Sequence, residues 1–246
     1  MDPKKLEAVK DPQKLKIKIF ADGANKEGML AMYARPYIKG FTTNPTLMRK
    51  AGISDYKAFA QDVLKSIKDR PISFEVFSDD LEEMERQAVE IASWGTNVYV
   101  KIPVTNTKGT FCGDVIRALA NKKVKMNVTA VMTLEQIKQI VPCMNNGVPG
   151  VISVFAGRVA DTGRDPVPHM QQALTILKPF PNLELLWASP RELLNIFQAD
   201  EIGCHIITVT NDILEKLSLL NKDLSHYSLE TVQMFYNDAQ KSGFSL

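Results

Sequence analysis

Short apolar, β-branched runs alternate along this chain with longer segments whose apolar residues recur at helical spacing. The run from Asn97 to Pro103 is representative, because apolar residues surround a single lysine, Lys101, and a proline follows. Such runs indicate parallel strands that are covered on both faces. The predicted strands span residues 17–22, 38–43, 72–77, 97–103, 125–131, 150–155, 183–188 and 205–209.

Segments with helical spacing separate these strands. They span residues 27–35, 56–68, 81–94, 109–121, 167–177, 192–198 and 211–220, and one more helix opens at Thr133. About eight repeats of roughly 25 to 30 residues predict an α/β fold, the (β/α)8 TIM barrel. A doubly wound open sheet is the alternative, weakened because no glycine-rich phosphate loop follows the first strand. We expect one barrel domain over residues 1–246, with an N-terminal extension over 1–15.

An extra C-terminal helix is predicted at about residues 223–243, where Gly243 suits its end. One face would carry apolar side chains, namely Leu229, Val232, Phe235, Tyr236 and Ala239. Because an exposed face of this size favours association, we expect it to cover the barrel or a neighbouring subunit. A homo-oligomer is therefore one expected arrangement.

Composition narrows the class of protein. The chain has 246 residues and a formal net charge of +2, and no basic stripe interleaved with aromatic residues suggests nucleic acid. No apolar run is long enough to span a membrane, and no apolar region follows the N-terminal lysines as in a signal peptide. Three widely spaced cysteines fit buried thiols in a reducing compartment. We expect a cytoplasmic protein without a nucleic-acid or membrane partner, and the three histidines are too scattered for a metal site.

Polar residues gather where the predicted strands end, which is where barrel enzymes carry their chemistry. Asp22, Glu75 and Lys101 lie in apolar strands and would be expensive to bury without pairing or function. Each polar residue alone has an ordinary structural explanation: Lys101 could extend its amine to the rim, and Asp22 could cap a helix. The other strand-end candidates are Thr43, Asn44, Asn127, Thr129, Ser153, Arg158, Ser189 and Arg191.

A set of short motifs carries a resemblance to a known family. They are Phe20-Ala21-Asp22, Thr42-Thr43-Asn44-Pro45, Val100-Lys101-Ile102-Pro103, Asn127-Val128-Thr129, the run from Ile152 to Arg158, and the run from Trp187 to Arg191. With these motifs the chain resembles a transaldolase, in the family that also contains the fructose-6-phosphate aldolases, which are class I Schiff-base enzymes. The sequence departs from the pattern at Val154 and Thr210, where proline is usual.

The resemblance implies a catalytic role for four residues. Lys101 resembles the lysine that forms a Schiff base with the ketone of a sugar phosphate. Asp22 resembles the acid/base that takes the proton of the C4 hydroxyl. Glu75 and Thr129 resemble the pair that holds the water of carbinolamine dehydration. No metal or cofactor is implied, because the iminium itself serves as the electron sink.

The remaining candidates resemble substrate-binding residues. Asn44 and Asn127 would bond the dihydroxyacetone unit, and Ser153 its terminal hydroxyl. The phosphate would be held by Arg158, Arg191 and Ser189, since a guanidinium offers forked donors that match phosphate. Thr43 and Phe155 complete the predicted substrate-binding set.

The resemblance also implies an activity, with alternatives. We expect a transaldolase of the non-oxidative pentose phosphate pathway, which moves a dihydroxyacetone unit from sedoheptulose 7-phosphate or fructose 6-phosphate to an aldose phosphate. Glu75 and Phe155 favour transfer, because the aldolases of the family carry glutamine and tyrosine at these places. The alternatives are an aldolase that releases free dihydroxyacetone and a non-catalytic phosphosugar-binding barrel.

Overall fold

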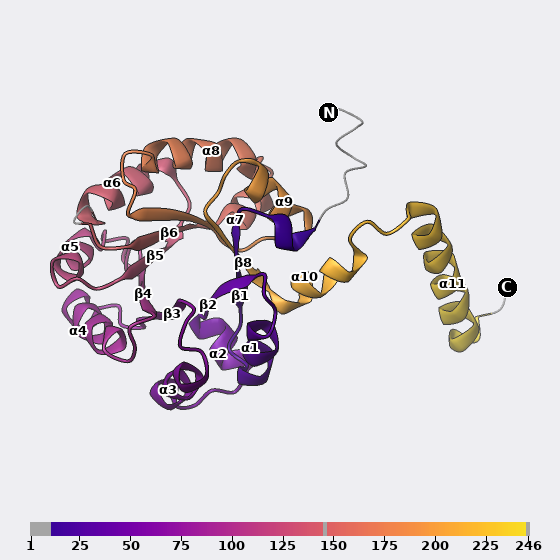
Figure 1. Cartoon of the computed structure of the whole chain (residues 1–246), viewed down its shortest axis with the longest axis horizontal. Coiled ribbons are helices and arrows are strands. Elements are labelled where there is room, and N and C mark those ends of the chain that lie inside the picture. The colour runs from indigo at the N-terminus through magenta and orange to yellow at the C-terminus, as the bar shows by residue number, and fades with distance from the viewer. Residues whose placement is uncertain (1–10, 145–146, 245–246) are drawn as a thin grey trace.

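Eight parallel strands close into a barrel in the computed structural model, which describes residues 11–144 and 147–244 (Figure 1). Each strand pairs with the next along the chain, and β1 closes the barrel against β8. The predicted (β/α)8 barrel is confirmed, and the open-sheet alternative is wrong. The strands are β1 (Lys18–Asp22), β2 (Ile38–Thr42), β3 (Ile72–Glu75), β4 (Val98–Pro103), β5 (Met126–Val131), β6 (Gly150–Val154), β7 (Leu183–Trp187) and β8 (Ile206–Thr210).

Helices surround the barrel on its outer face, except the C-terminal one, which lies apart from it (Figure 1). They are α1 (Lys26–Tyr33), α2 (Pro45–Lys50), α3 (Tyr56–Ser66), α4 (Leu81–Ala92), α5 (Gly113–Asn121), α6 (Leu134–Met144), α7 (Ala156–Asp161), α8 (Pro166–Leu177), α9 (Leu194–Glu201), α10 (Asn211–Glu215) and α11 (Leu224–Ser242). Short 3-10 helices span Pro12–Lys14 and Lys216–Leu219. The sequence pattern missed α2 and α7, because each has fewer than two full turns and shows too little periodicity.

Local sequence explains where several helices begin. Asp55, Asp80 and Asp165 each accept a backbone N–H of the first turn, at the starts of α3, α4 and α8. In α4 the buried residues Met84, Ala88 and Ile91 recur at helical spacing and face the sheet. Capping and apolar spacing together place these helices against the outside of the barrel.

A small apolar cluster fills the inside of the barrel. It consists of Phe20, Val151, Leu186, Ala188 and Ile206, all less than a tenth exposed. Gly40 leaves room for it, because a Cβ at that position would lie 2.6 Å from the ring of Phe20. These side chains occupy the middle of the barrel, and Phe20, Val151 and Ile206 also line a cavity of about 230 Å³ there.

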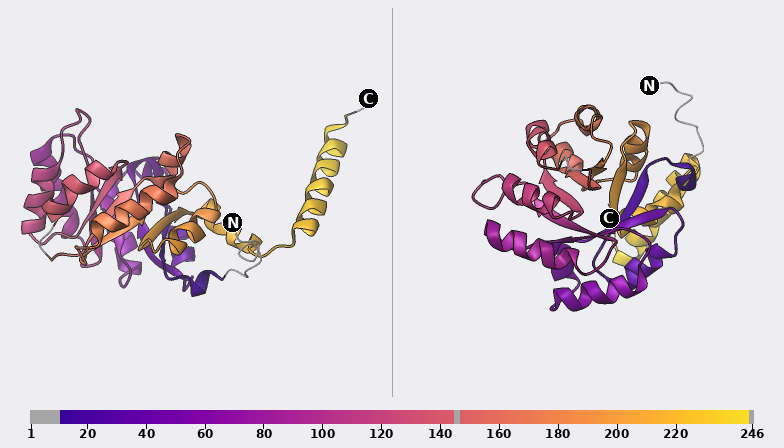
Figure 2. Two further views of the ribbon diagram at one scale, coloured as in Figure 1. Left: turned by 90° about the horizontal axis from the view of Figure 1, so that it is seen from above. Right: turned by 60° about the vertical axis from the view of Figure 1, so that its left-hand side comes forward.

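The C-terminal helix α11 forms close to its predicted bounds, with Asp223 as N-cap and Gly243 in a left-handed conformation after its end. It projects away from the barrel in Figure 1 and in the left-hand view of Figure 2. No residue of this helix is buried, and the side chains of Phe235 and Tyr236 are 63% and 64% exposed. The expected docking on its own barrel is therefore wrong, while docking on a neighbouring subunit stays a prediction.

None of the helices in the described ranges combines the length and the apolar character that a membrane crossing requires.

Candidate active site

Polar side chains converge on a cavity of about 700 Å³ at the carboxyl ends of the strands. Ten of the residues predicted from the sequence line it: Asp22, Asn44, Glu75, Lys101, Thr129, Ser153, Phe155, Arg158, Ser189 and Arg191. Strands β1, β3, β4, β5 and β6 supply five of them, and the other five follow β2, β6 or β7, in the turn after the strand or in α7. The predicted strand-end cluster is therefore one cavity in three dimensions.

Lys101 lies at the floor of this cavity and is 7% exposed. Its Nζ donates to the carbonyl oxygen of Thr43 at 3.0 Å and lies 3.3 Å from Glu75 Oε2. The strand register explains the second contact, because Glu75 and Lys101 are partners in the β3–β4 ladder. The amine thus stays inside the barrel instead of reaching the rim, and it is held between fixed oxygen atoms.

Asp22 lies beside this lysine with an unusual electrostatic environment. Burial raises the pKa of the Asp22 carboxyl, and the nearby charge of Glu75 adds to this, while Lys101 and a hydrogen bond from Thr42 lower it. The hydroxyl of Thr42 donates to Asp22 Oδ1 at 2.7 Å and also contacts the hydroxyl of Thr208. A carboxyl whose pKa is raised toward neutrality is suited to giving and taking a proton.

Tyr56 fixes the backbone of Glu75. Its hydroxyl donates to the Glu75 carbonyl oxygen at 2.8 Å and accepts the Glu75 N–H at 2.7 Å. Burial raises the pKa of Tyr56, so this hydroxyl keeps the proton that it donates. Tyr56 opens helix α3 and carried no sign of this role in the sequence.

Thr129 points into the cavity from an irregular part of β5. Ala130 has a positive φ of 62°, and the register with β6 shifts between Val128 and Val131. Such irregularities re-aim side chains next to active sites. The Thr129 hydroxyl is buried and has no hydrogen-bond partner among the described residues. It is therefore available to a substrate or to a water molecule.

Two predicted substrate-binding residues lie behind the cavity wall. Thr43 is 0% exposed and its hydroxyl donates to the Ser73 carbonyl oxygen at 2.8 Å. Asn127 is 1% exposed and accepts the Ser153 hydroxyl at 2.6 Å. Neither lines the cavity, whereas Thr42, which was not a candidate, does. Asn44 lines the cavity and also caps α2 by accepting the Leu47 N–H at 2.9 Å.

The two candidate phosphate-binding arginines approach from adjacent strands. Gly157, in the first turn of α7, permits this because a Cβ there would lie 1.5 Å from the Ser189 carbonyl oxygen. Arg158 lies 5.2 Å from the centre of the Phe155 ring. Arg191 forms a forked ion pair with Asp161, which comes one helical turn after Arg158. Asp161 was missed by sequence reasoning, and its spacing from Arg158 is the one signal that could have found it.

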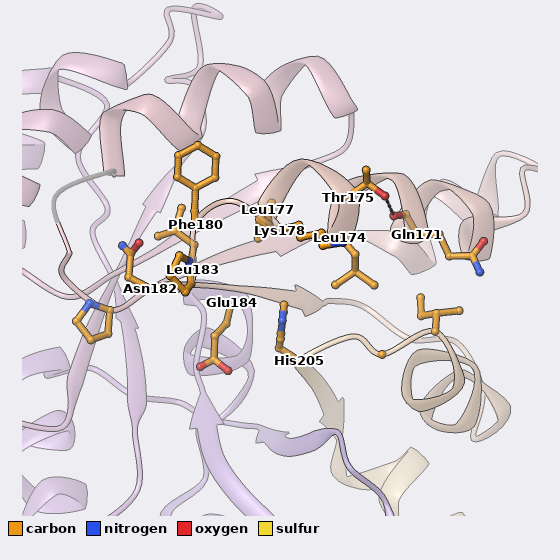
Figure 3. A pocket seen from close by; sticks show the side chains of 14 residues that line it. Gln171, Leu174, Thr175, Leu177, Lys178, Phe180, Asn182, Leu183, Glu184 and His205 are labelled. Atoms are coloured by element: carbon orange, nitrogen blue, oxygen red, sulfur yellow. Dashed lines mark hydrogen bonds between the residues drawn. The ribbon is translucent and has the colours of Figure 1, made fainter.

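A second cavity, of about 720 Å³, lies on the outside of the barrel between α8 and the start of β7 (Figure 3). Several of its polar groups already have local partners. Thr175 donates to Gln171 O within its own helix, Glu184 pairs with Lys18, and His205 Nδ1 accepts the Leu185 N–H. Because these groups do not converge, the chemistry is assigned to the cavity at the carboxyl ends of the strands.

The other candidate chemistries find little support in the geometry. Within residues 11–144 and 147–244, no three His, Cys, Asp or Glu side chains lie in a group that could hold a metal ion. Cys112, Cys143 and Cys204 are free and buried, as predicted for structural thiols.

Comparison with known proteins identifies the family of this chain. A family model described as "Transaldolase/Fructose-6-phosphate aldolase" matches residues 19–246. The chain belongs to the transaldolase/fructose-6-phosphate aldolase family. It is 33% identical over 204 residues to a probable transaldolase of Dehalococcoides mccartyi, covering 82% of this chain and 90% of that protein. It is 31% identical over 231 residues to a probable transaldolase of Thermoanaerobacter, covering 94% of this chain and 100% of that protein.

Solved structures support the fold of this family member. A HpcH/HpaI aldolase/citrate lyase family protein of Burkholderia cenocepacia superimposes with a TM-score of 0.56 at 13% identity. The match covers 90% of this chain and 98% of that one. At this identity the similarity concerns the barrel and says nothing about the reaction.

Proposed function

We propose that this family member is a transaldolase, which transfers a dihydroxyacetone unit between sugar phosphates through a Schiff base on Lys101. One observation carries the proposal: a buried lysine amine lies at the barrel's carboxyl end, 3.3 Å from Glu75 and beside the partly buried Asp22. A primary amine in this environment is suited to attack a carbonyl. Family membership supports a sugar phosphate as the substrate.

Imine formation would use Lys101, Glu75 and Thr129. The neutral amine attacks the C2 carbonyl of a ketose phosphate, and the carbonyl oxygen becomes the hydroxyl of a carbinolamine. That hydroxyl leaves as water after it receives a proton, and the iminium remains. Glu75 is close enough to Nζ to exchange protons with it, and the unpaired Thr129 hydroxyl can hold the departing water.

Bond cleavage and transfer would use Asp22. Its carboxylate takes the proton of the C4 hydroxyl, the C3–C4 bond breaks, and its electron pair moves into the iminium to give an enamine. The aldose phosphate leaves. The enamine carbon then attacks the aldehyde of an acceptor, and Asp22 returns the proton to the new hydroxyl. The raised pKa of Asp22 suits it to both directions of this proton transfer.

Arg158 and Arg191 would hold the phosphate at the rim. Arg158 is exposed and forms no ion pair with another described residue, so its guanidinium is available. Arg191 is oriented by Asp161 through its Nε and Nη2, and the Nη1 donors remain for an anion. Two guanidiniums beside Ser189 offer the forked donors that a phosphate monoester requires.

Phe155 and Glu75 support transfer over release of free ketone. Phe155 lines the cavity and has no hydroxyl that could donate a proton or order water beside the enamine. The enamine should therefore persist until an acceptor aldehyde arrives. We expect Phe155→Tyr to increase the release of free dihydroxyacetone.

Borohydride trapping with fructose 6-phosphate tests the proposal. Reduction should leave a permanent adduct, and peptide mapping should place it on Lys101. Fructose 6-phosphate alone should turn over slowly, and erythrose 4-phosphate should accelerate its consumption and yield sedoheptulose 7-phosphate. Release of dihydroxyacetone as fast as transfer would replace the transferase with an aldolase, and no adduct at all would favour a binding barrel.

The exposed helix α11 supports a homo-oligomer. An isolated helix of this length is only marginally stable in water, and tertiary packing normally stabilises one. We propose that its apolar side chains pack against another subunit, since its own barrel does not cover them. Sedimentation of a chain truncated after Lys222 should show a smaller assembly than the full chain. An unchanged monomer of full stability would contradict docking.

A further inference from the structure

The hydrogen-bond ladder between β2 and β3 ends just before Glu75. Its last printed bond runs from the Thr43 N–H to the Ser73 carbonyl oxygen at 3.1 Å. Backbone groups two residues apart on a strand face the same neighbour, so a longer ladder would join the Glu75 N–H to the Thr43 carbonyl. It would then need an N–H from residue 45 for the Glu75 carbonyl. Pro45 has none and begins α2, so β2 cannot supply this bond.

The Tyr56 hydroxyl takes the place of both missing ladder bonds. It donates to the Glu75 carbonyl oxygen at 2.8 Å and accepts the Glu75 N–H at 2.7 Å. These directions have no alternative, because a carbonyl can only accept and an N–H can only donate. The ring that carries the hydroxyl packs edge-on against Phe74 and Phe77 and tilted against Trp94. Packing therefore holds the hydroxyl in place.

This arrangement determines which groups surround the lysine amine. The Glu75 N–H has one proton and gives it to Tyr56, so the Thr43 carbonyl does not receive it. The Thr43 carbonyl oxygen instead accepts the Lys101 amine at 3.0 Å. The Glu75 carboxylate lies 3.3 Å from the same amine. Tyr56 thus acts on both oxygen groups that hold Nζ, although it does not line the cavity itself.

The two backbone bonds also aim the Glu75 side chain. They hold the peptide groups on either side of its Cα, and these groups set the direction of the Cα–Cβ bond. Without the hydroxyl, the Glu75 N–H and carbonyl would lose their partners, and buried backbone groups are almost always paired. The Thr43 carbonyl is the acceptor that the ladder offers. One more ladder bond would bring the ends of β2 and β3 together and would displace both oxygen groups around the amine.

We propose that Tyr56 is a positioning residue for imine formation. Its hydroxyl replaces the last ladder bonds between β2 and β3, and it thereby keeps the Lys101 amine between the Thr43 carbonyl and the Glu75 carboxylate. The inference rests on the proposed function and deepens it. Because Tyr56 acts through Glu75 and lies outside the cavity, it should govern the rate of imine formation and leave substrate binding unchanged.

Tyr56→Phe tests the proposal on the full chain, because it removes the hydroxyl and keeps the ring. The protein is mixed with fructose 6-phosphate, borohydride is added after successive times, and intact mass gives the fraction that carries an adduct. The rate constant at saturation should fall by about ten- to a hundredfold, as expected for a misplacement of up to about 1 Å. The half-saturating concentration should stay within about twofold of that of the unmodified chain.

Trp94→Phe is the matched control for packing. Trp94 contacts the Tyr56 ring at a centroid distance of 5.8 Å, and the substitution leaves the hydroxyl in place. It should lower the free energy of unfolding and leave the rate constant of adduct formation unchanged. The final amount of adduct counts the folded protein, so a partly unfolded variant still reports its own rate constant.

The outcomes that overturn the inference are distinct from those that overturn the function. An unchanged rate constant in Tyr56→Phe, or a raised half-saturating concentration at an unchanged rate constant, would refute the positioning role. Equal slowing in Trp94→Phe would assign the effect to packing of the rings. If the unmodified chain forms no adduct with fructose 6-phosphate, the Schiff-base function fails first and the role of Tyr56 fails with it.

Discussion

Within this barrel, neighbouring inward-facing residues on the same strand differ sharply in character. Phe20, Tyr99 and Val151 face the middle of the barrel, and two residues later come Asp22, Lys101 and Ser153. The first set packs side chain against side chain, and the second set lines the open cavity. On each of these three strands, two residues that are two positions apart thus belong to different regions. The first stabilises the fold, and the second is suited to chemistry.

We call the residues that pack in the middle of the barrel the apolar layer, and those that line the cavity the polar layer. The difference between them shows how the apolar layer supports the polar layer. Asp22 and Lys101 are costly to bury, and the apolar side chains beneath them help to hold their strands together. We therefore expect substitutions in the apolar layer to lower stability and substitutions in the polar layer to lower activity. Four predictions test this contrast, from the largest effect to the smallest.

Lys101→Met should abolish transfer, with a loss in kcat on the order of 10⁶, as when other covalent nucleophiles are removed. The variant should form no borohydride adduct and should keep its circular dichroism spectrum. Steady-state transfer assays and intact-mass analysis measure the two effects. Full activity in this variant would refute the Schiff base at Lys101.

Asp22→Asn should lower kcat by about 10²- to 10⁴-fold, the usual contribution of a general acid/base. It should also raise the free energy of unfolding at neutral pH. Because burial raises the pKa of Asp22, the folded state binds its proton more tightly than the unfolded state, and the ionised carboxylate destabilises the fold above the folded-state pKa.

The pH dependence of the free energy of unfolding tests whether the ionised Asp22 destabilises the fold. The stability advantage of Asp22→Asn should be greatest at neutral pH and should shrink as the pH falls through the raised pKa of Asp22 toward the ordinary value of an aspartate. Urea unfolding of both proteins at several pH values measures it. A variant less stable than the unmodified chain at neutral pH would show that pairing with Lys101 outweighs burial.

Leu186→Ala tests the apolar layer. Leu186 is 0% exposed inside the barrel, and truncation of a buried leucine lowers the free energy of unfolding by about 2 to 5 kcal/mol. The folded fraction should still form the Lys101 adduct with near-normal affinity. If the adduct is lost while the barrel remains folded, the apolar layer contributes to activity as well as to stability.

Arg158→Ala or Arg191→Ala should mainly raise KM for phosphorylated sugars, by roughly 1.5 to 3 kcal/mol in binding free energy. Unphosphorylated substrates should change much less. Arg164→Ala is a matched control, because Arg164 follows α7 and bonds Thr162 without lining the cavity. Equal losses for both substrate types would reject the phosphate clamp.

The sequence predicted the barrel because each strand and each long helix has its own apolar pattern. It also predicted Asp22, Glu75 and Lys101, because charged residues stand out in apolar strands. Tyr56 and Asp161 could not be found in the same way. Each gains its role from a residue on another segment, and that meeting depends on strand register and on the angle at which a helix leaves the sheet.

The position of the C-terminal helix was beyond sequence reasoning for a related reason. Amphipathic spacing predicts that a face will be covered, but it does not say by what. The same spacing in α4 leads to packing on the barrel, and in α11 it leads to exposure on this chain. The connection from Leu220 to Asp223 directs α11 away before its apolar residues can reach the sheet (Figure 2).

Closure of the barrel by β1 and β8 has a consequence for how the chain folds. Lys18 pairs with Ile206, and the N–H groups of Lys16 and Ile17 both donate to Asp200, 184 and 183 residues away in the sequence. Contacts between such distant residues form late, so folding should be slow compared with that of a helical protein of similar stability. Until β8 arrives, β1 is an open edge that can pair with another chain. Nascent or truncated chains that stop before β8 should therefore depend on chaperones, and aggregation should compete with their folding.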